Sequence, residues 1–147
     1  DNRSSRGLGD VYKRQDNDNV EDLFMNKLNF DLHSSFQDLR NVKVSAHLYI
    51  KRDGTIIQFV PFNKCAWHAG ESIFKGRKNC NEFSIGIEIQ GKVDEEYTRE
   101  QYENLKKIVD ALKNFFQLDD VVAHSEISPE RKKDPGPLFD WSKLDEN

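Results

Sequence analysis

The segment from Thr98 to Phe116 limits the possible folds of this chain most strongly. Thr98 and Gln101 have the spacing of a capping box, in which two side chains satisfy free backbone N–H groups at a helix start. Apolar residues then recur every three or four positions, as on the buried face of a surface helix: Tyr102, Leu105, Ile108, Val109, Leu112, Phe115 and Phe116. The spacing predicts one long helix that packs on another layer through this face.

Strand patterns lie on both sides of this helix. Val44–Lys51 alternates apolar and polar residues, and Thr55–Val60 returns after an Asp-Gly turn. Phe83–Gln90 has an isoleucine at every second position from Ile85, and Val121–His124 is a β-branched run that predicts a further strand. We therefore expect an α/β fold (mixed α+β), a single domain whose central mixed β-sheet is flanked by helices.

The remaining segments are less regular. Asn63–Asn81 predicts a long loop, and the region before Val44 predicts a short helical turn, a loop and a helix around Ser34–Leu39. The segment Ser4–Gln15 has no apolar periodicity and looks like a translated sequencing adapter. We expect residues 1–15 to be non-native and residues 16–147 to form the domain.

Composition excludes several classes of function. The 147 residues suit one domain, and 36% hydrophobic and 33% charged residues with a net charge of −4 are typical of a soluble protein without a basic surface for nucleic acid. No apolar stretch approaches the roughly 20 residues of a membrane helix. Cys65 and Cys80 do not make a disulfide framework; we expect two reduced thiols, and one disulfide between them remains possible.

A histidine and an aspartate near the C-terminus are candidate metal ligands. Asp134 follows His124 by ten positions and is held on a Pro-Gly-Pro corner, where the prolines fix φ. Imidazole and carboxylate are typical Zn²⁺ ligands, and a catalytic zinc takes three protein ligands and leaves one position open. Each residue alone is more often structural, so the combination carries the hypothesis, and two of three ligands are visible.

Two further residues are candidates for catalysis. Glu88 shares a strand face with Gly86 and Gln90, and a carboxylate there suits a general base whose pKa is tuned by burial. The alternative is an edge strand with one solvated face. Lys132, two positions before Asp134, could stabilise an oxyanion, although its sequence context favours a solvated surface charge.

Trp67 and His68 stand on a loop that ends in Gly70. They could form a wall for a sugar or peptide substrate, or could be a packing tryptophan and a hydrogen-bonded histidine.

Together these segments resemble the zinc-dependent N-acetylmuramoyl-L-alanine amidases of the AmpD type, from about Leu23 to Leu144. The motifs that carry the resemblance are Val44–His47, Arg52–Gly54 with Ile57–Phe62, Ala66–Gly70, Cys80–Glu88, Tyr97-Thr98, Ala123-His124, and Asp134–Pro137 with Phe139–Trp141.

The resemblance implies a role for each candidate. His124 and Asp134 would be two of three ligands of a Zn²⁺ cofactor, Glu88 the catalytic glutamate, and Lys132 the cation that stabilises the transition state. The residues that would line the substrate groove are Lys43, Trp67, His68 and Ser128. Lys43 stands where such enzymes have arginine, and a lysine loses bidentate geometry toward a carboxylate.

One departure from the family is serious. The family's first zinc histidine ends a β-strand upstream of the Val44 strand, and that stretch would overlap the adapter-like residues. His33 resembles a different family position. We therefore expect the first strand and its histidine to be absent, which would expose sheet edges and impair zinc binding and stability.

The function implied is hydrolysis of the amide between N-acetylmuramic acid, most simply its 1,6-anhydro form, and L-alanine of muropeptides. The setting would be cytoplasmic peptidoglycan recycling by a monomer that has no nucleic-acid or membrane partner. One alternative is a non-catalytic peptidoglycan-binding module, which needs no combination of Asp134, Lys132 and Glu88. The other is an exported or phage lytic amidase acting on polymeric wall, for which no wall-binding repeats are present.

Overall fold

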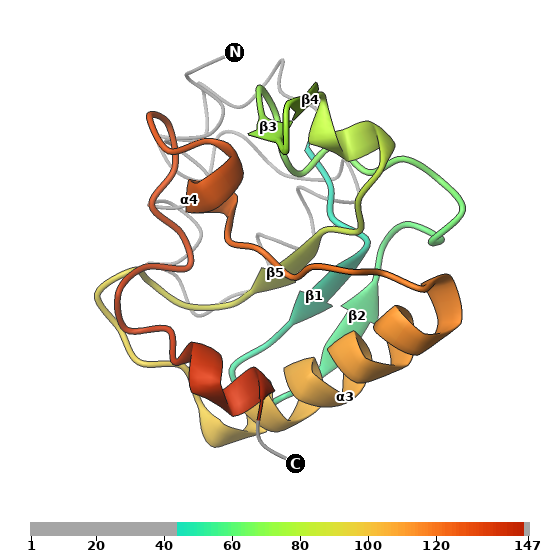
Figure 1. Cartoon of the computed structure of the whole chain (residues 1–147). Coiled ribbons are helices and arrows are strands. Elements are labelled where there is room, and N and C mark those ends of the chain that lie inside the picture. Colours follow the sequence, from blue (N-terminus) through green and yellow to red (C-terminus); the bar gives the residue numbers. More distant parts are fainter. Residues whose placement is uncertain (1–43, 146–147) are drawn as a thin grey trace, which may run out of the picture.

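A three-stranded mixed sheet forms the centre of the described part of the chain, residues 44–145 of a computed structural model (Figure 1). Its strands are β1 (Leu48–Ile50), β2 (Ile56–Gln58) and β5 (Ile87–Ile89), in the order β2-β1-β5. β1 pairs antiparallel with β2 and parallel with β5. The expected mixed sheet is confirmed, with strands shorter than the alternating patterns predicted.

The hairpin between β1 and β2 closes at the predicted Asp-Gly turn. The backbone N–H of Gly54 donates to the carbonyl of Lys51 over 2.9 Å, and the N–H of Lys51 donates to the carbonyl of Thr55 over 2.8 Å. Gly54 has φ +89°, a value that glycine adopts without strain. The turn sets the antiparallel register in which Leu48 faces Gln58.

The long helix α3 (Arg99–Phe116) begins at the predicted capping box. The Thr98 side chain accepts from the Gln101 backbone, and the Gln101 side chain accepts from the Thr98 backbone. The Gln101 amide, buried at 1% exposure, also donates to the carbonyl of Gln90 over 2.7 Å. One glutamine therefore starts the helix and fixes its first turn to the sheet.

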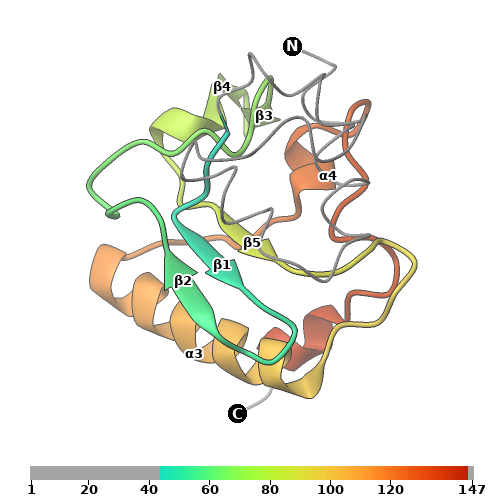
Figure 2. The ribbon, with the colours of Figure 1, turned by 180° about the vertical axis from the view of Figure 1, so that it is seen from behind.

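One face of α3 packs on the sheet and forms the core. Leu105 and Val109 contact Ile50 of β1 together with Tyr97 and Phe139. Ile87 and Ile89 pack against the same cluster, as their alternation predicts, and the helix runs along this face of the sheet in both views (Figures 1 and 2). The last turn differs from prediction, because Phe115 is 79% and Phe116 is 40% exposed.

The predicted loop from Asn63 to Asn81 contains a small hairpin, so that expectation was incomplete. Strands β3 (Ile73–Phe74) and β4 (Arg77–Lys78) pair antiparallel, and the short 3-10 helix η2 (Cys80–Glu82) follows. The turn residues Lys75 and Gly76 both have positive φ, +48° and +80°. Two-residue strands are too short to show an alternating pattern, which is why the sequence did not reveal them.

The prediction of a strand at Val121–His124 was wrong. His124 instead opens a short helix, α4 (His124–Ile127), and the last element is the 3-10 helix η3 (Trp141–Leu144). Ala123 keeps an extended backbone, with φ −75° and ψ 153°. Extended residues become a strand only when a neighbouring strand supplies ladder hydrogen bonds, and within residues 44–145 none does.

Several expectations fall outside the described residues. These are the adapter-like residues 1–15, the helix at Ser34–Leu39, His33 and Lys43. Within the described part, both cysteines are free thiols, and no helix has the length and apolar character needed to cross a membrane.

Candidate active site

The two predicted metal ligands lie against each other. Nδ1 of His124 is 3.2 Å from Oδ2 of Asp134, and the two side chains are 17% and 26% exposed. The backbones are joined as well, because the N–H of Ser125 donates to the carbonyl of Asp134 over 3.1 Å. The start of α4 and the Pro-Gly-Pro corner therefore form one unit that presents an imidazole nitrogen and a carboxylate together.

The corner after Asp134 is held from the other side by Tyr97. Its hydroxyl donates to the carbonyl of Pro135 over 2.9 Å. Gly136 has φ +89°, and a Cβ at this position would lie 2.7 Å from the carbonyl oxygen of Val93. Only glycine fits there, so the position of Asp134 depends on close backbone packing as well as on hydrogen bonds.

Glu88 lies close to this corner. It pairs with Tyr49 in the parallel register of β5 on β1 and is partly buried. Burial raises the pKa of the Tyr97 hydroxyl, and the negative charges of Glu88 and then Asp134 raise it further. Both carboxylates therefore act on the Tyr97 hydroxyl, and Glu88 and Asp134 also line the same cavity.

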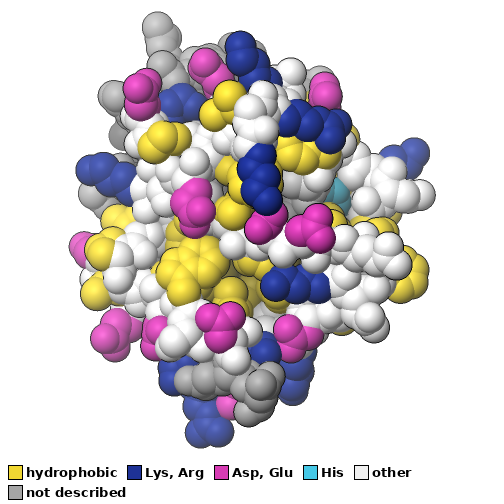
Figure 3. All heavy atoms as spheres, in the orientation of Figure 1, with side chains coloured by type: hydrophobic (Ala, Val, Ile, Leu, Met, Phe, Trp, Pro, Cys, Tyr) yellow, Lys and Arg dark blue, Asp and Glu magenta, His cyan; other side chains and the backbone are white. Residues whose placement is uncertain are grey.

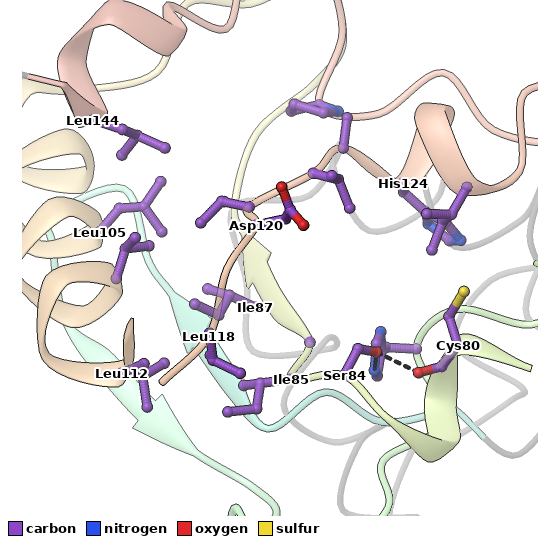
Figure 4. Close-up of a pocket in the computed structure, with 18 of the residues that line it drawn as sticks. Cys80, Ser84, Ile85, Ile87, Leu105, Leu112, Leu118, Asp120, His124 and Leu144 are labelled. Carbon is purple, nitrogen blue, oxygen red and sulfur yellow. Dashed lines mark hydrogen bonds between the residues drawn. The ribbon is translucent and has the colours of Figure 1, made fainter. Parts of the chain in front are cut away.

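A cavity of about 420 Å³ connects these groups with the core. Figure 4 shows His124 with Ser84 and Cys80 at one end and Leu105, Leu112 and Leu144 at the other. Glu88 and Asp134 also line this cavity. The space-filling view shows hydrophobic side chains gathered in the middle of one face, with acidic and basic side chains around them (Figure 3).

The apolar length of this cavity lies between β5 and the segment before α4. Its lining includes residues of β5 and the preceding turn, of α3, and of the extended segment. These are Ile85, Ile87, Ile89, Leu105, Val109, Leu112, Leu118, Val121 and Val122. Within residues 44–145, β5 pairs on one side only, with β1, so its other edge has no strand partner there.

The loop that carries Trp67 and His68 is anchored by Asn81. The Asn81 side-chain oxygen accepts from the backbone N–H groups of His68 and Ala69, over 3.1 Å and 2.7 Å. The Ala69 carbonyl in turn lies 2.9 Å from Nε2 of His124. A carbonyl can only accept, so Nε2 carries the proton in this contact, and Nδ1 is the nitrogen directed at Asp134.

His47 has a structural role. Its Nδ1 accepts from the N–H of Gly86 over 3.1 Å, which requires Nε2 to carry the proton that is donated to the carbonyl of Lys64 over 2.7 Å. The ring is 1% exposed. Both nitrogens are engaged, so His47 is not a ligand in this arrangement.

His68 is held differently. The Ser84 hydroxyl donates its one proton to the carbonyl of Cys80, so its oxygen accepts from Nε2 of His68 over 3.3 Å. The ring lies directly against Gly86, where any Cβ would overlap it. The glycine that precedes Glu88 by two positions therefore provides the space for His68.

Acidification is expected to destabilise the chain through His68. Burial lowers the pKa of His68 to about 4, and the neighbouring His47 and His124 contribute to this shift. In the unfolded chain the pKa returns to 6.5, so the unfolded state takes up a proton first as the pH falls. The free energy of unfolding should therefore decrease as the pH falls from about 6.5 to about 4, by roughly 3 kcal/mol, and this contribution should change no further below that range.

Urea titrations of the metal-free protein at several pH values would measure this effect. His68→Gln removes the titrating group and is expected to show a flatter dependence over the same range. Equal pH dependence in the two proteins would assign the acid sensitivity to other groups.

The remaining residues predicted to line the substrate groove differ in how far they are exposed. Trp67 is 47% exposed and is not among the residues that line the cavity. Ser128 is 5% exposed, and its hydroxyl donates to the carbonyl of Glu71 over 2.6 Å, which engages it with the 67–71 loop. The backbone N–H of Lys132 donates to the carbonyl of Ser128 over 2.9 Å, so Lys132 belongs to the same turn.

A zinc ion fits this site in part. Nδ1 of His124 and an oxygen of Asp134 are suitable donors that already converge. Among residues 44–145, however, no group of three or more histidine, cysteine, aspartate or glutamate side chains is placed to hold a metal ion. Within this range the structure therefore brings together two of the three predicted donors.

Sequence reasoning gave no role to three residues that shape the site. Tyr97 holds the Pro135 carbonyl, Asn81 anchors the loop before Gly70, and Arg131 binds that loop's carbonyls. Tyr97 and Asn81 could have been found from the sequence, because both lie within motifs that carry the family resemblance. Arg131 could not, because a basic residue beside Lys132 and Lys133 is usually solvated.

Comparison with known proteins identifies the family. Residues 14–137 match the family Amidase_2, described as N-acetylmuramoyl-L-alanine amidase. The chain is 44% identical over 127 residues to the 1,6-anhydro-N-acetylmuramyl-L-alanine amidase AmpD of Enterobacter cloacae, covering 85% of this chain and 68% of that protein. It is 33% identical to the N-acetylmuramoyl-L-alanine amidase AmiD of Escherichia coli, covering 78% of this chain and 48% of that protein.

Solved structures give the same relationship. A crystal structure of selenomethionine AmpD superimposes with a TM-score of 0.85 at 42% identity, covering 88% of this chain and 73% of that one. Escherichia coli AmiD, in complex with the substrate anhydro-N-acetylmuramic acid-L-Ala-D-γ-Glu-L-Lys, gives 0.68 at 32% identity, covering 80% and 52%. The chain therefore belongs to the N-acetylmuramoyl-L-alanine amidase family and is of the AmpD type.

Proposed function

We propose that this protein hydrolyses the amide bond between 1,6-anhydro-N-acetylmuramic acid and L-alanine in muropeptides, within cytoplasmic peptidoglycan recycling. Family membership and the names of the AmpD relatives support this substrate. The AmiD complex supports it as well, because that enzyme holds an anhydro-muramyl peptide. The working domain in this proposal is residues 16–147.

The observation that carries the proposal is the convergence of three side chains on one cavity. His124 and Asp134 contact each other, and Glu88 lines the same cavity. The cavity continues into an apolar region large enough to take part of a ligand or a further chain segment. Imidazole and two carboxylates from separate elements, placed together in a cleft, are typical of a hydrolytic site.

His124 and Asp134 would provide two ligands of a zinc ion. When bound, zinc supplies Lewis-acid polarisation of the substrate carbonyl and makes a water molecule more acidic. We infer that the third ligand arrives with a strand that pairs with the other edge of β5. The apolar cavity beside that edge supports this, since parallel strands are normally covered by neighbours.

Three side chains of the protein would then have separate roles in the reaction. The Glu88 carboxylate accepts a proton from the attacking water and returns it to the leaving amine of L-alanine. Lys132 follows the turn that carries Ser128 and brings a positive charge for the oxyanion. Tyr97 keeps its proton and holds the Pro135 carbonyl, and thereby the Asp134 corner.

The test is a direct assay of amide cleavage. The protein and a form lengthened by the N-terminal segment of Enterobacter cloacae AmpD are each loaded with zinc and incubated with anhydro-muramyl tripeptide, and release of the L-alanyl peptide is followed by liquid chromatography and mass spectrometry. Release of free peptide, abolished by a chelator and restored by zinc, is the expected result. Binding of the muropeptide without product would instead identify a recognition module, and cleavage of polymeric wall alone would identify a lytic amidase.

A further inference from the structure

A loop and a turn that are far apart in the sequence are joined beside the site. The loop is residues 67–71, which includes Trp67, and the turn is residues 128–132, which includes Lys132. Helix α4 leads into the turn and contacts β3, the strand that follows the loop, and the two elements lie side by side in both views (Figures 1 and 2). The contact between loop and turn therefore sets where Lys132 stands relative to Trp67.

The Arg131 side chain spans the space between the two segments. Its Nη2 group donates to the carbonyls of Ala69 and Glu71 over 3.0 Å and 2.6 Å, and its Nε donates to the Glu71 carbonyl over 3.2 Å. Gly70 lies between these carbonyls with φ +63°, and a Cβ there would be 2.8 Å from Nη2. A larger residue at position 70 would displace the guanidinium, so this contact requires glycine.

The 128–132 turn is closed on its own first residue. The Ser128 carbonyl accepts from the backbone N–H groups of Arg131 and Lys132, over 3.0 Å and 2.9 Å. The Ser128 hydroxyl donates to the Glu71 carbonyl over 2.6 Å, which adds a second bond between turn and loop. Lys132 therefore directly follows the residue that binds the loop, and a turn that moved away from the loop would carry Lys132 with it.

We propose that Arg131 is a positioning residue: by binding carbonyls of the 67–71 loop, it holds the turn from which Lys132 reaches the reacting carbonyl. The role of Lys132 rests on the proposed function, whereas the joining of loop and turn does not. Arginine suits this task because its planar fork donates from two nitrogens in fixed directions, whereas lysine has a single ammonium on a flexible stem. Arg131→Lys keeps the charge and loses the fork, so it separates a held position from the effect of a nearby positive charge.

Amide hydrogen exchange in the metal-free protein tests the joining directly. The backbone N–H groups of Ala69 and Lys132 are both hydrogen-bonded and report on the loop and on the turn. We expect both to exchange faster in Arg131→Gln and Arg131→Lys, on the order of 10-fold, because local opening becomes easier. Lys133→Gln is the matched control, since the exposed Lys133 lies in the same basic run, and it should leave both rates unchanged. Unchanged rates in a folded Arg131→Gln protein would overturn the proposal.

A double-mutant cycle tests whether Arg131 acts through Lys132. Release of L-alanyl peptide is measured in the zinc-loaded chain lengthened by the N-terminal segment of Enterobacter cloacae AmpD. Arg131→Gln and Arg131→Lys should each lower kcat on the order of 10-fold while zinc is retained. The same changes made together with Lys132→Met should have a much smaller effect, because the group that Arg131 positions is already gone.

Three kinetic results would contradict the proposal: equal effects with and without Lys132→Met, full kcat in Arg131→Lys, or loss of zinc, which would place the effect at the metal ligands. If Arg131→Gln does not fold, Arg131→Lys decides. A lengthened chain without turnover in any form would overturn the proposed function and, with it, the role of Lys132. The exchange rates of the metal-free protein would still decide whether Arg131 joins the loop to the turn.

Discussion

In a chain lengthened by the N-terminal segment of Enterobacter cloacae AmpD, replacing Glu88 by glutamine is expected to lower kcat for anhydro-muropeptide by a factor on the order of 10²–10⁴ while leaving bound zinc in place. Glutamine has nearly the same shape as glutamate and fits the same position on β5. It cannot accept a proton from water, so the loss falls on the chemical step. KM should change much less than kcat, because no contact that holds the substrate has been removed.

The measurement is steady-state release of L-alanyl peptide, with zinc content determined on the same samples. Glu103→Gln is the matched control, since Glu103 pairs with Arg99 on the exposed surface of α3 and lies outside the cavity lining. It should retain full turnover. Near-normal kcat in Glu88→Gln would remove Glu88 from the role of general base.

On the proposal that the third zinc ligand lies on a strand beside β5, a chain lengthened by the N-terminal segment of Enterobacter cloacae AmpD is expected to bind equimolar zinc and to bind more zinc than the present chain. Two donors, His124 and Asp134, converge in the described residues, and a catalytic zinc needs three. The added strand would pair with the other edge of β5 and fill the apolar cavity. Thermal stability should therefore rise even without metal, because apolar surface is buried and strand hydrogen bonds form.

Elemental analysis and thermal melts of both proteins would test this. The matched control is the lengthened chain with its added zinc histidine replaced by alanine, which should gain stability and remain poor in zinc. Tight zinc in the present chain would contradict the expectation and would mean that another of its histidines is the third ligand. His33→Ala and His68→Ala would then show which one, since both nitrogens of His47 are engaged.

Elements held by contacts between residues close in sequence could be predicted from the sequence alone. The Thr98–Gln101 capping box and the Asp-Gly turn are satisfied by neighbours within a few residues, and both appear as predicted. The spacing of Leu105, Val109 and Leu112 likewise predicts the buried face of α3. Phe115 and Phe116 continue the same spacing and are exposed, because periodicity does not show where the supporting sheet ends.

The run Val121–His124 shows the opposite case. Its β-branched residues favour an extended backbone, and Ala123 has one, yet a strand also needs a partner at the right distance. The same limit applies to Arg131. The side chains of a basic run in a sequence are usually exposed to solvent. Only the structure shows that the Arg131 guanidinium packs against Gly70 and donates to a carbonyl of a loop sixty residues away.

The sequence, through its residue types and its resemblance to AmpD-type amidases, was enough to predict which chemical groups are available: an imidazole, two carboxylates and a lysine. Tertiary structure decided which nitrogen of His124 is directed at Asp134, that His47 is fully hydrogen-bonded within the core, and that Tyr97 and Arg131 support the site. The physical reason is that a side chain's donors and acceptors follow from its identity. Their partners come from distant segments and are determined only when the chain has folded.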